Sequence, residues 1–315
     1  MTWYVRRASL HDKPALEELC RMAVGPDDYV LLYLEDLILR SVLHVAIEGK
    51  DRIAGMMAYR PCIDGSAWLG QARTHPDFRR QGVARALVDS FVGIARASNV
   101  HALRLWSDAT NQEGIASFAS AGFREVGRFG RVKGAAARGV VRSRPRAFDE
   151  DLWRQVSASP IVRKGKGYAH HEHTFVPATR PVVFAIAAKG AFRGWDGHVL
   201  TVQENRERDD ELWVTMWAGD AAGLLAEVCR LAHSLGRTHV QTFLPYDREL
   251  LSEARRAGYE EGTWGKEAVL AELPVAPANL RKRVRPTYGE LAAKRSGHGH
   301  AHEEGDELGW ARWNP

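Results

Sequence analysis

The sequence predicts an α/β protein with a mixed sheet of the α+β type, written as two tandem copies of one unit, the second copy degenerate. Apolar runs of strand length alternate with stretches whose apolar residues recur about every 3.6 positions, as in helices that cover a sheet. Gly122-Phe123 and Gly258-Tyr259 stand 136 positions apart, and the elements before them are offset by nearly the same amount. A chain of 315 residues is long enough for roughly two such domains.

The first copy begins with a strand, two helical stretches and a hairpin. WYVRR predicts a strand, and Ser9 with Asp12 forms a capping box at the start of a helix that contains KPALEEL. DDYVLLYLEDLILR predicts a second helix. LHVAIEG and RIAGMMAYRP are apolar runs on either side of residues 49–51, a hairpin signal.

The rest of the first copy alternates strands and helices. AWLGQART predicts a strand that ends before Pro76, and VARALVDSFVGIAR a helix with one apolar face. HALRLW predicts a strand, NQEGIASFASAGF a helix that ends at Gly122, and residues 123–132 a final strand. Residues 134–179 are rich in Gly, Arg, Ser and Pro and predict a connector, with one helix at FDEDLWRQV.

The second copy repeats much of this order. VVFAIAAKG and HVLTVQE predict a strand pair, followed by a strand at ELWVTMWAG and a helix at AAGLLAEVCRLAHSLG. THVQTFL predicts a strand, DRELLSEARRAGY a helix that ends at Gly258, and KEAVLAEL the last strand. From Pro274 onwards the composition is typical of a tail that wraps the surface or stays mobile.

Composition and charge exclude several functional classes. The apolar runs fall far short of the roughly 18 to 20 residues that span a bilayer, and no secretion signal is recognisable, so we expect a cytoplasmic protein with no membrane partner. Cys20, Cys62 and Cys229 are widely spaced and odd in number, which predicts buried, reduced thiols. The net charge of +5 favours anionic partners, but the basic clusters lack interleaved aromatic residues, so nucleic acid is not an expected partner.

The strongest chemical signal is the junction THPDFRRQGVAR between a strand and a helix. A helix N-terminus carries unpaired backbone N–H groups and about half a positive charge. Gly82 allows a turn and the close approach of a ligand, while Arg79 and Arg80 add positive charge. The junction therefore predicts a diphosphate site, although neither GxGxxG nor a Walker sequence is present.

The run ARTHPDFRRQGVARAL resembles the acetyl-CoA loop of the GNAT N-acetyltransferase superfamily, whose pattern is R/Q-x-x-G-x-G/A. Arg79, Gly82 and Ala84 match this pattern, and Pro76 matches the end of the preceding strand, where Thr74 replaces the usual valine. LRLWSDATN and ASFASAGF resemble the next strand and helix of the family, and VRRASLHDKPALEEL resembles its start. The resemblance covers residues 1–132 by motif and 179–273 by order of elements only.

The resemblance implies a site for acetyl-CoA. Backbone groups of Ala72 and Thr74 would pair with the pantetheine arm like an extra strand, and the backbone amides of residues 80–85 would hold the pyrophosphate. Asn111 would reach the pantetheine near the thioester. The residues expected to contact acetyl-CoA are Ala72, Thr74, Arg79, Arg80, Gln81, Gly82, Val83, Ala84, Arg85, Asn111 and Phe118.

The catalytic residues stay open. Many family members use a tyrosine four residues before the glycine of Gly-Phe to protonate the leaving thiolate, and this chain has Phe118 there. Asp108, Asp64, His75 and Tyr29 are candidate bases, none of them favoured over the others.

Other segments bear on the acceptor and on metals. PDDYVLLYLEDLILR and the connector resemble the histidine N-acetyltransferase-like branch of the family, which implies a small amino-acid acceptor near Asp28 and Tyr29. In the second copy WAGDAAGLL replaces RRQGVARAL, and Asp220 would repel a pyrophosphate, so this copy is predicted to complete the fold and wall the acceptor site without binding CoA. The histidines predict no metal site, because a mobile segment gives them no rigid support; they are His170, His171, His173, His298, His300 and His302.

These observations predict an acetyl-CoA-binding catalytic domain at residues 1–146, a connector with a degenerate second domain at 147–275, and a basic, His-rich tail at 276–315. The predicted activity is transfer of acetyl from acetyl-CoA to a primary amine, a small molecule or amino acid rather than a protein, by direct attack. A CoA-binding sensor with weak or no catalysis and a nucleic-acid binder are the alternatives, and a homodimer stays open.

Overall fold

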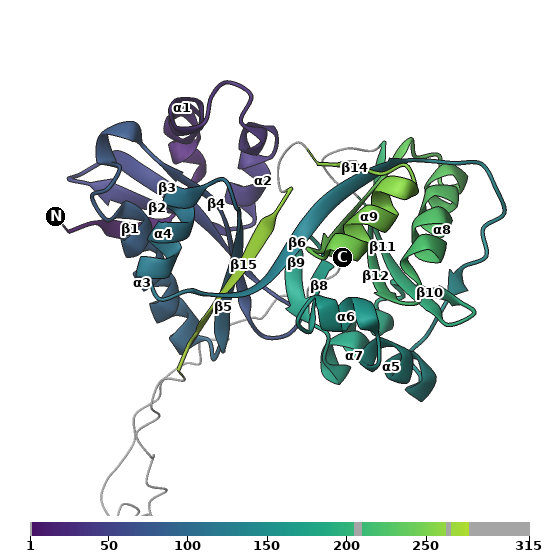
Figure 1. Cartoon of the computed structure of the whole chain (residues 1–315). Helices are drawn as coiled ribbons and strands as arrows, with labels where there is room; N and C mark the ends of the chain where they lie inside the picture. The colour runs from purple at the N-terminus through teal and green to yellow at the C-terminus, as the bar shows by residue number, and fades with distance from the viewer. Residues whose placement is uncertain (1, 205–209, 263–265, 277–315) are drawn as a thin grey trace, which may run out of the picture. The chain divides into compact units, whose positions relative to one another are not determined.

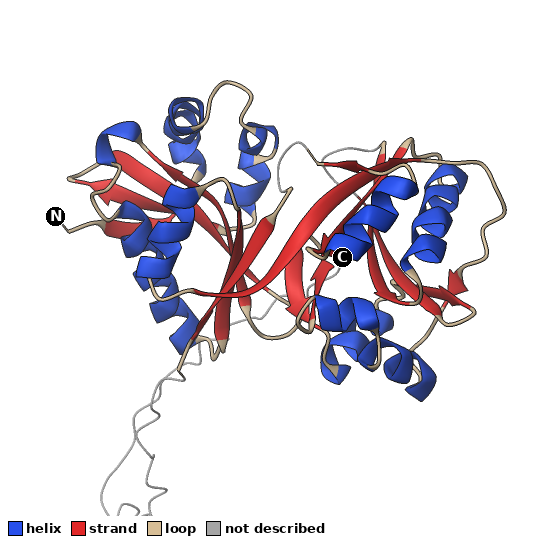
Figure 2. Cartoon of the chain, in the orientation of Figure 1, coloured by secondary structure: helices blue, strands red, loops and turns tan. Residues whose placement is uncertain are grey.

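A long mixed sheet runs through the protein, and helices cover both of its faces (Figures 1 and 2). The computed structural model describes residues 2–204, 210–262 and 266–276, and these belong to one compact unit. Apart from residue 276, the predicted tail lies outside the described residues. Below, residues 2–146 are called the N-terminal half and the described residues from 147 onwards the C-terminal half.

The N-terminal half contributes the first seven strands. They are β1 (Tyr4–Arg7), β2 (Leu43–Glu48), β3 (Arg52–Pro61), β4 (Ala67–Thr74), β5 (Ala102–Asp108), β6 (Arg124–Ala135) and β7 (Arg144–Pro145). The helices are α1 (Lys13–Ala23), α2 (Leu34–Leu39), α3 (Val83–Ala97) and α4 (Gln112–Ser120), with 3₁₀ turns η1 (Leu10–Asp12), η2 (Tyr29–Leu32) and η3 (Pro76–Phe78).

The C-terminal half contributes the remaining elements. Its helices are α5 (Glu150–Ser157), α6 (Pro160–Lys164), α7 (Arg180–Ala188), α8 (Ala221–Ser234) and α9 (Arg248–Arg256). Its strands are β8 (Tyr168–His171), β9 (Thr174–Pro177), β10 (Phe192–Trp195), β11 (His198–Glu204), β12 (Glu211–Ala218), β13 (His239–Pro245), β14 (Glu260–Glu261) and β15 (Ala268–Pro274).

The two halves share the sheet, whose strand order is β1-β2-β3-β4-β5-β15-β6-β13-β12-β11-β10-β7, with β14 also paired to β6. Strand β15 comes from the end of the described chain, yet it lies antiparallel between β5 and β6 of the N-terminal half. Strand β6 in turn pairs with β13. Each half therefore depends on strands of the other for its hydrogen bonding.

A buried charge network ties β15 to its neighbours. Arg104 on β5 donates to Glu272 on β15 at 2.6 Å and to Asp64 at 2.5 Å, and its side chain is only 3% exposed. The hydroxyl of Tyr168 on β8 donates to the same Glu272 carboxylate at 2.9 Å. Such hydrogen bonds to charged groups are worth about 1.5–3 kcal/mol each when buried. The network fixes β15 beside β5.

Apolar faces explain how the helices cover the sheet. The helix α3 buries Val83, Leu87, Val88 and Phe91 on one side, and this cluster includes Tyr59 of β3. On the other face α1 and α2 pack against a second cluster, and the C-terminal half is arranged alike, with α8 and α9 on one face and α5 and α7 on the other. The predicted mixed α/β fold is confirmed.

Three sequence predictions about individual elements are wrong. VVFAIAA is the helix α7, not a strand, because a short apolar run fits a buried helix equally well, and Pro181 stands at its first turn. DDYVLLYLEDLILR is not one helix but breaks into η2 and α2. The connector histidines are not mobile: His170 and His171 lie on β8, paired with β9, and are 2% exposed.

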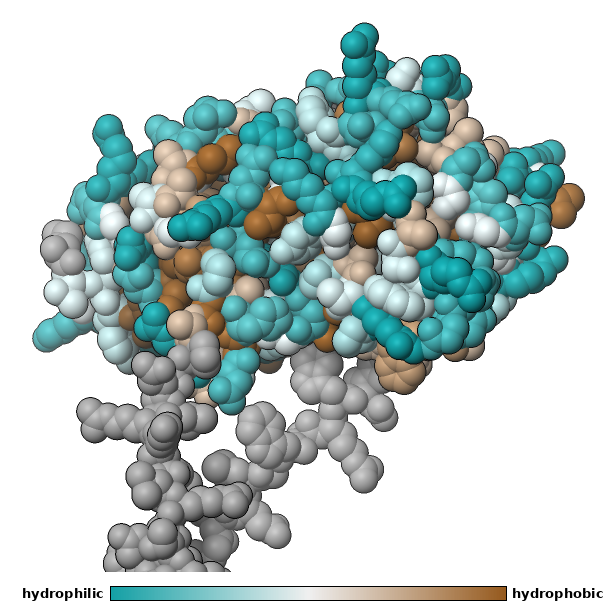
Figure 3. Space-filling model, turned by 60° about the horizontal axis from the view of Figure 1, so that its bottom comes forward, coloured by the Kyte–Doolittle hydropathy of each residue, from teal (hydrophilic) through white to brown (hydrophobic). Residues whose placement is uncertain are grey.

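No helix in the described ranges is long and apolar enough to cross a membrane. Hydrophilic side chains dominate the face shown in Figure 3, and hydrophobic patches lie between them, mostly toward the left of the view. All three cysteines are free, and Cys20 and Cys229 are buried as predicted, whereas Cys62 is only partly buried.

Candidate functional site

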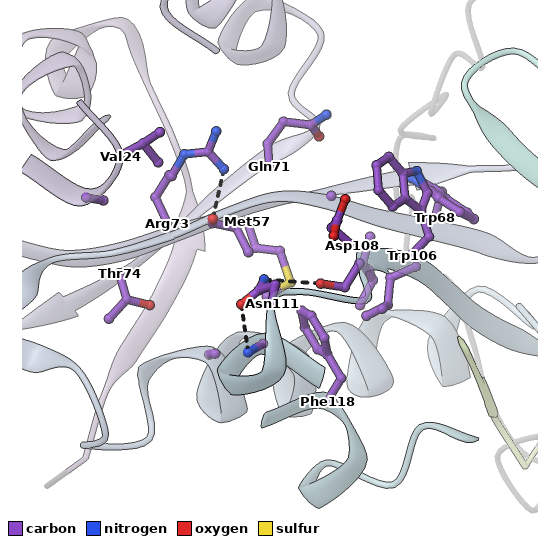
Figure 4. Close-up of a pocket in the computed structure, with 18 of the residues that line it drawn as sticks. Val24, Met57, Trp68, Gln71, Arg73, Thr74, Trp106, Asp108, Asn111 and Phe118 are labelled. Atoms are coloured by element: carbon purple, nitrogen blue, oxygen red, sulfur yellow. Dashed lines mark hydrogen bonds between the residues drawn. The ribbon is translucent and has the colours of Figure 1, made fainter. Parts of the chain in front are cut away.

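A gap between two parallel strands opens a large cavity in the N-terminal half. Strands β4 and β5 pair only at Ala67 with Leu103 and at Trp68 with Arg104, and beyond these residues they separate. The register of β3 and β4 shifts opposite Met57, where Gln71 takes a φ of 53°. The cavity that follows has a volume of about 1290 Å³, and Figure 4 shows side chains of both strands around it.

The N-terminus of α3 forms one end of this cavity. Gly82 precedes the helix with a φ of 84°, in the left-handed region that glycine favours, and no side chain caps the helix. The first backbone bond of the helix runs from the amide of Ala86 to the carbonyl of Gly82. The amides of residues 83–85 thus have no partner within the helix, and they lie where an anion could accept from them.

Three arginines surround that helix end, and only one of them is uncommitted. Arg79 donates to the carbonyl of Ala23 at 3.0 Å, and Arg85 pairs with Asp89 at 2.9 Å. Arg80, whose φ is 62°, is exposed and has no side-chain partner in the described part of the chain. Its charge is available to a bound anion.

Asn111 and Phe118 also line the cavity, at and within α4 (Figure 4). The Asn111 side chain accepts from the amide of Gly114 at 3.0 Å and donates to the Ser107 hydroxyl at 3.1 Å, so α4 and β5 together hold it. Phe118 packs edge-on against Phe123. A phenylalanine at this place can shape the cavity but cannot give a proton to a thiolate.

The structure brings ten of the eleven residues expected at the acetyl-CoA site to one cavity: Ala72, Thr74, Arg79, Arg80, Gly82, Val83, Ala84, Arg85, Asn111 and Phe118. Gln81 does not line it. The side-chain Nε2 of Gln81 donates to the backbone carbonyl of Asp77 at 2.7 Å, and the backbone carbonyl of Gln81 accepts from the indole of Trp3 at 3.0 Å.

The two residues predicted near the acceptor lie in different surroundings. Tyr29 lines the cavity. Asp28 does not, because its carboxylate is buried and accepts two hydrogen bonds from Arg73 at 2.6 Å. Burial alone would raise the pKa of Asp28, but the Arg73 guanidinium outweighs it, so the pKa lies below its ordinary value. Asp28 thus anchors Arg73 on β4 rather than facing a ligand.

The four candidate bases also lie in different surroundings. Asp108 lines the cavity at the end of β5, where its carboxylate accepts from the amide and hydroxyl of Thr110. Tyr29 lines it as well. The Asp64 carboxylate accepts hydrogen bonds from Arg104 and Ser66. The ring of His75 accepts from the backbone amide of Asp77 and does not line the cavity.

Sequence reasoning did not assign a further set of residues to the cavity, most of them from the C-terminal half. The far wall of the cavity is formed by Arg131 of β6 together with His170, His173, Glu211, Trp213 and Phe243. Local patterns offer no signal for them, since they come from segments that are distant in the sequence and meet only in the folded chain. Arg60 and Trp68, cross-strand neighbours on β3 and β4, line the cavity as well and were not predicted.

His170 sits in an aromatic cage on that wall. Its ring lies 5.1 Å from Trp213 and 5.0 Å from Phe243, and its Nδ1 is buried with no hydrogen-bond partner. Burial lowers the pKa of His170 well below its usual range, so the imidazole is neutral at pH 7. In the described ranges no group of three or more His, Cys, Asp or Glu side chains is arranged to hold a metal ion.

Part of the chain matches a known protein family. Residues 12–123 match the model of the acetyltransferase (GNAT) family. No curated protein shows significant sequence similarity to the chain.

Solved structures resemble nearly the whole chain. A protein from Thermoplasma acidophilum, assigned as an acetyltransferase, is 12% identical with a TM-score of 0.58, covering 86% of this chain and 99% of its own. A GCN5-related N-acetyltransferase from Sphaerobacter thermophilus is 15% identical with a TM-score of 0.57, covering 88% and 96%. At such identities the likeness concerns the fold. The match to the GNAT acetyltransferase family thus covers residues 12–123, and the solved structures show that most of the chain shares a GNAT-like fold.

Proposed function

We propose that the protein transfers the acetyl group of acetyl-CoA to a primary amine of a small molecule by direct attack. The observation that carries the proposal is the single cavity joining the uncapped N-terminus of α3 to the gap between β4 and β5. A diphosphate at the amides of residues 83–85 would be stabilised by the helix dipole and by Arg80. The free backbone edge of β4 near Ala72 and Thr74 would then pair with the pantetheine arm.

The thioester would come to rest where β4 and β5 diverge. There the amine nitrogen attacks the carbonyl carbon, the C–S bond breaks, and the amine gives up one proton while the thiolate takes one. We assign the proton acceptor to Asp108, directly or through one water, because it lies at the end of β5 on the cavity wall. Phe118 supplies no proton, so the thiolate takes its proton from water.

The C-terminal half serves the same reaction as the outer wall of the acceptor site. We propose that it is a second, degenerate GNAT-like unit that no longer binds CoA, in a tandem arrangement of residues 1–146 and 147–275. Its wall residues Trp213, Phe243 and His170 support this role. The three free thiols fit a cytoplasmic setting.

The test is acetyl-CoA-dependent release of thiol with a panel of primary amines. We expect release with some amines, an Asp108→Asn variant at least about 10²-fold slower in kcat with unchanged CoA affinity, and partial recovery in Asp108→Glu. Tight CoA binding without release for any amine would instead support the sensor, the alternative that Phe118 favours.

A further inference from the structure

An arginine in the cavity wall has no anion to pair with. Arg60, near the end of β3, lines the cavity, and its Nε is buried without a hydrogen-bond partner. In the described ranges no carboxylate forms an ion pair with it. Burial lowers the pKa of Arg60, because the surroundings disfavour its charged form.

The buried arginines Arg73 and Arg104 of the N-terminal half, unlike Arg60, have carboxylate partners. Arg73 is held by the Asp28 carboxylate, and Arg104 is held by two carboxylates. A guanidinium that is buried without a carboxylate partner destabilises the fold. An unpaired buried guanidinium therefore indicates that a ligand supplies the anion. Arg60 is the exception in a half that otherwise pairs its buried arginines.

The position of Arg60 separates it from the diphosphate. It is the cross-strand partner of Trp68, at the end of β4 where β4 and β5 are still paired. The amides of α3 follow the other end of β4, beyond Thr74. Six residues of strand correspond to about 20 Å. Arg60 therefore cannot hold the diphosphate that α3 holds, and its anion must belong to another molecule.

The side chain of Arg60 points to the face of the sheet that α1 and α2 cover. Along β3, Met57 and Tyr59 belong to the cluster around α3, while Met56 and Ala58 belong to the cluster around α1 and α2. Because alternate residues of a strand point to opposite faces, Arg60 continues the second set. The carboxylate of Glu172 acts on it only electrostatically, being 56% exposed and paired with His171 and Lys189.

A second unpartnered atom lies nearer the gap. The side-chain oxygen of Gln71 is buried without a hydrogen-bond partner and lines the same cavity, three positions after Trp68 on β4. It can accept a hydrogen bond but cannot donate one, so it complements an N–H donor. Arg60 offers N–H donors instead, so it complements an anion that accepts hydrogen bonds.

We propose that Arg60 binds a carboxylate of the acceptor, which is therefore an amine that also carries a carboxylate, of the amino-acid class. The carboxylate would receive the guanidinium hydrogen bonds, and the acceptor nitrogen would donate to Gln71 at the strand gap. This inference rests on the proposed acetyl transfer and adds its substrate class.

The experiment compares matched amines with and without a carboxylate. The pairs are L-phenylalanine with phenethylamine, L-tryptophan with tryptamine, L-histidine with histamine, and L-lysine with cadaverine, each measured for acetyl-CoA-dependent thiol release. We expect the acid of at least one pair to be favoured by about 10- to 100-fold in kcat/KM. Arg60→Gln should abolish that preference and Arg60→Lys should keep most of it, with CoA affinity unchanged in both.

Two results would overturn the inference: equal use of both members of every pair, or the same preference in Arg60→Gln as in the wild type. Should no pair release thiol, the N-acetylated acids and their amides are titrated instead, using the fluorescence of the tryptophans in the cavity wall. Absence of a carboxylate preference there, or of any binding, counts against Arg60 as well. Failure of acetyl transfer itself is distinguishable, since it would show as no thiol release with any amine while the N-acetylated acids would still bind better than their amides.

An independent readout is the stability of the free protein. Because Arg60 carries an uncompensated charge, Arg60→Gln should raise the Tm without ligands by about 2 °C or more. A lower Tm would show that Arg60 stabilises the fold and contradict the inference.

Discussion

The N-termini of α3 and α8 occupy corresponding places in the two halves and have opposite chemistry. Residues 75–82 form the loop before α3, which ends at Gly82. No side chain caps the amides at the start of this helix. Before α8 only residues 219–220 intervene, and Asp220 accepts from the amide of Gly223 at 2.7 Å while also bonding His198. The N-terminus of α3 is open to an external anion, whereas the N-terminus of α8 is capped by the carboxylate of Asp220.

The strands beside the two helices differ as well, since one pair is open and the other is closed. Strands β4 and β5 share two residue pairs and then separate, whereas β12 and β13 stay paired over four. Every residue of β12 is buried. The N-terminal half, where we propose that CoA binds, thus has an uncapped helix and an open strand edge, whereas the C-terminal half has a capped helix and paired strands.

The largest expected effect comes from giving α3 the cap of α8. In Gly82→Asp the carboxylate would take the helix amides and repel the diphosphate, so CoA affinity should fall at least about 100-fold, equivalent to about 2.7 kcal/mol. Titration calorimetry measures it. Gly82→Asn, equal in shape and equally tolerant of positive φ, is the control and should lose clearly less. Equal losses in both variants would mean that shape, not charge, matters.

The next effect concerns the dependence of one half on the other. Glu272→Ala leaves Arg104 and Tyr168 without one acceptor, and the free energy of unfolding should fall by about 1–3 kcal/mol in urea titrations. Glu272→Gln keeps an acceptor and should lose less. An unchanged midpoint in Glu272→Ala would show that β15 is not held by this network.

A smaller effect is expected at the cap of α8. Asp220→Ala should lower the free energy of unfolding by about 1 kcal/mol while leaving CoA affinity unchanged. The amide of Gly223 and then His198 lower the pKa of Asp220, so the cap is fully present above the ordinary carboxyl pKa and is lost as pH falls through the lowered one. The stability gap between wild type and variant should thus be constant near pH 6 and shrink below pH 4. A gap that persists in acid would contradict the role of the charge.

The smallest effect belongs to Arg80. Because its side chain is exposed, Arg80→Gln should weaken CoA binding only about 2- to 5-fold, and less so at high salt. Arg80→Lys keeps the charge and should bind nearly as well as the wild type. A loss above about 50-fold would indicate that Arg80, rather than the helix amides, dominates the site.

Sequence alone predicted the parts of the molecule that depend on local chemistry. The junction before α3 could be predicted because Gly82 and the arginines act within one turn of the helix they precede. The run VVFAIAA could not, since its burial pattern depends on neighbours far away in the chain. The insertion of β15 between β5 and β6, and with it the wall formed by Trp213 and Phe243, depends on strand pairing over more than a hundred residues, which no local pattern encodes.

The most direct test of the account is the stoichiometry of CoA binding to the intact chain. Titration calorimetry should give one CoA per chain in the wild type and in Asp220→Ala, and no measurable binding at the same concentrations in Gly82→Asp. Two molecules per chain, or one that survives in Gly82→Asp, would contradict the claim that α3 alone holds the diphosphate.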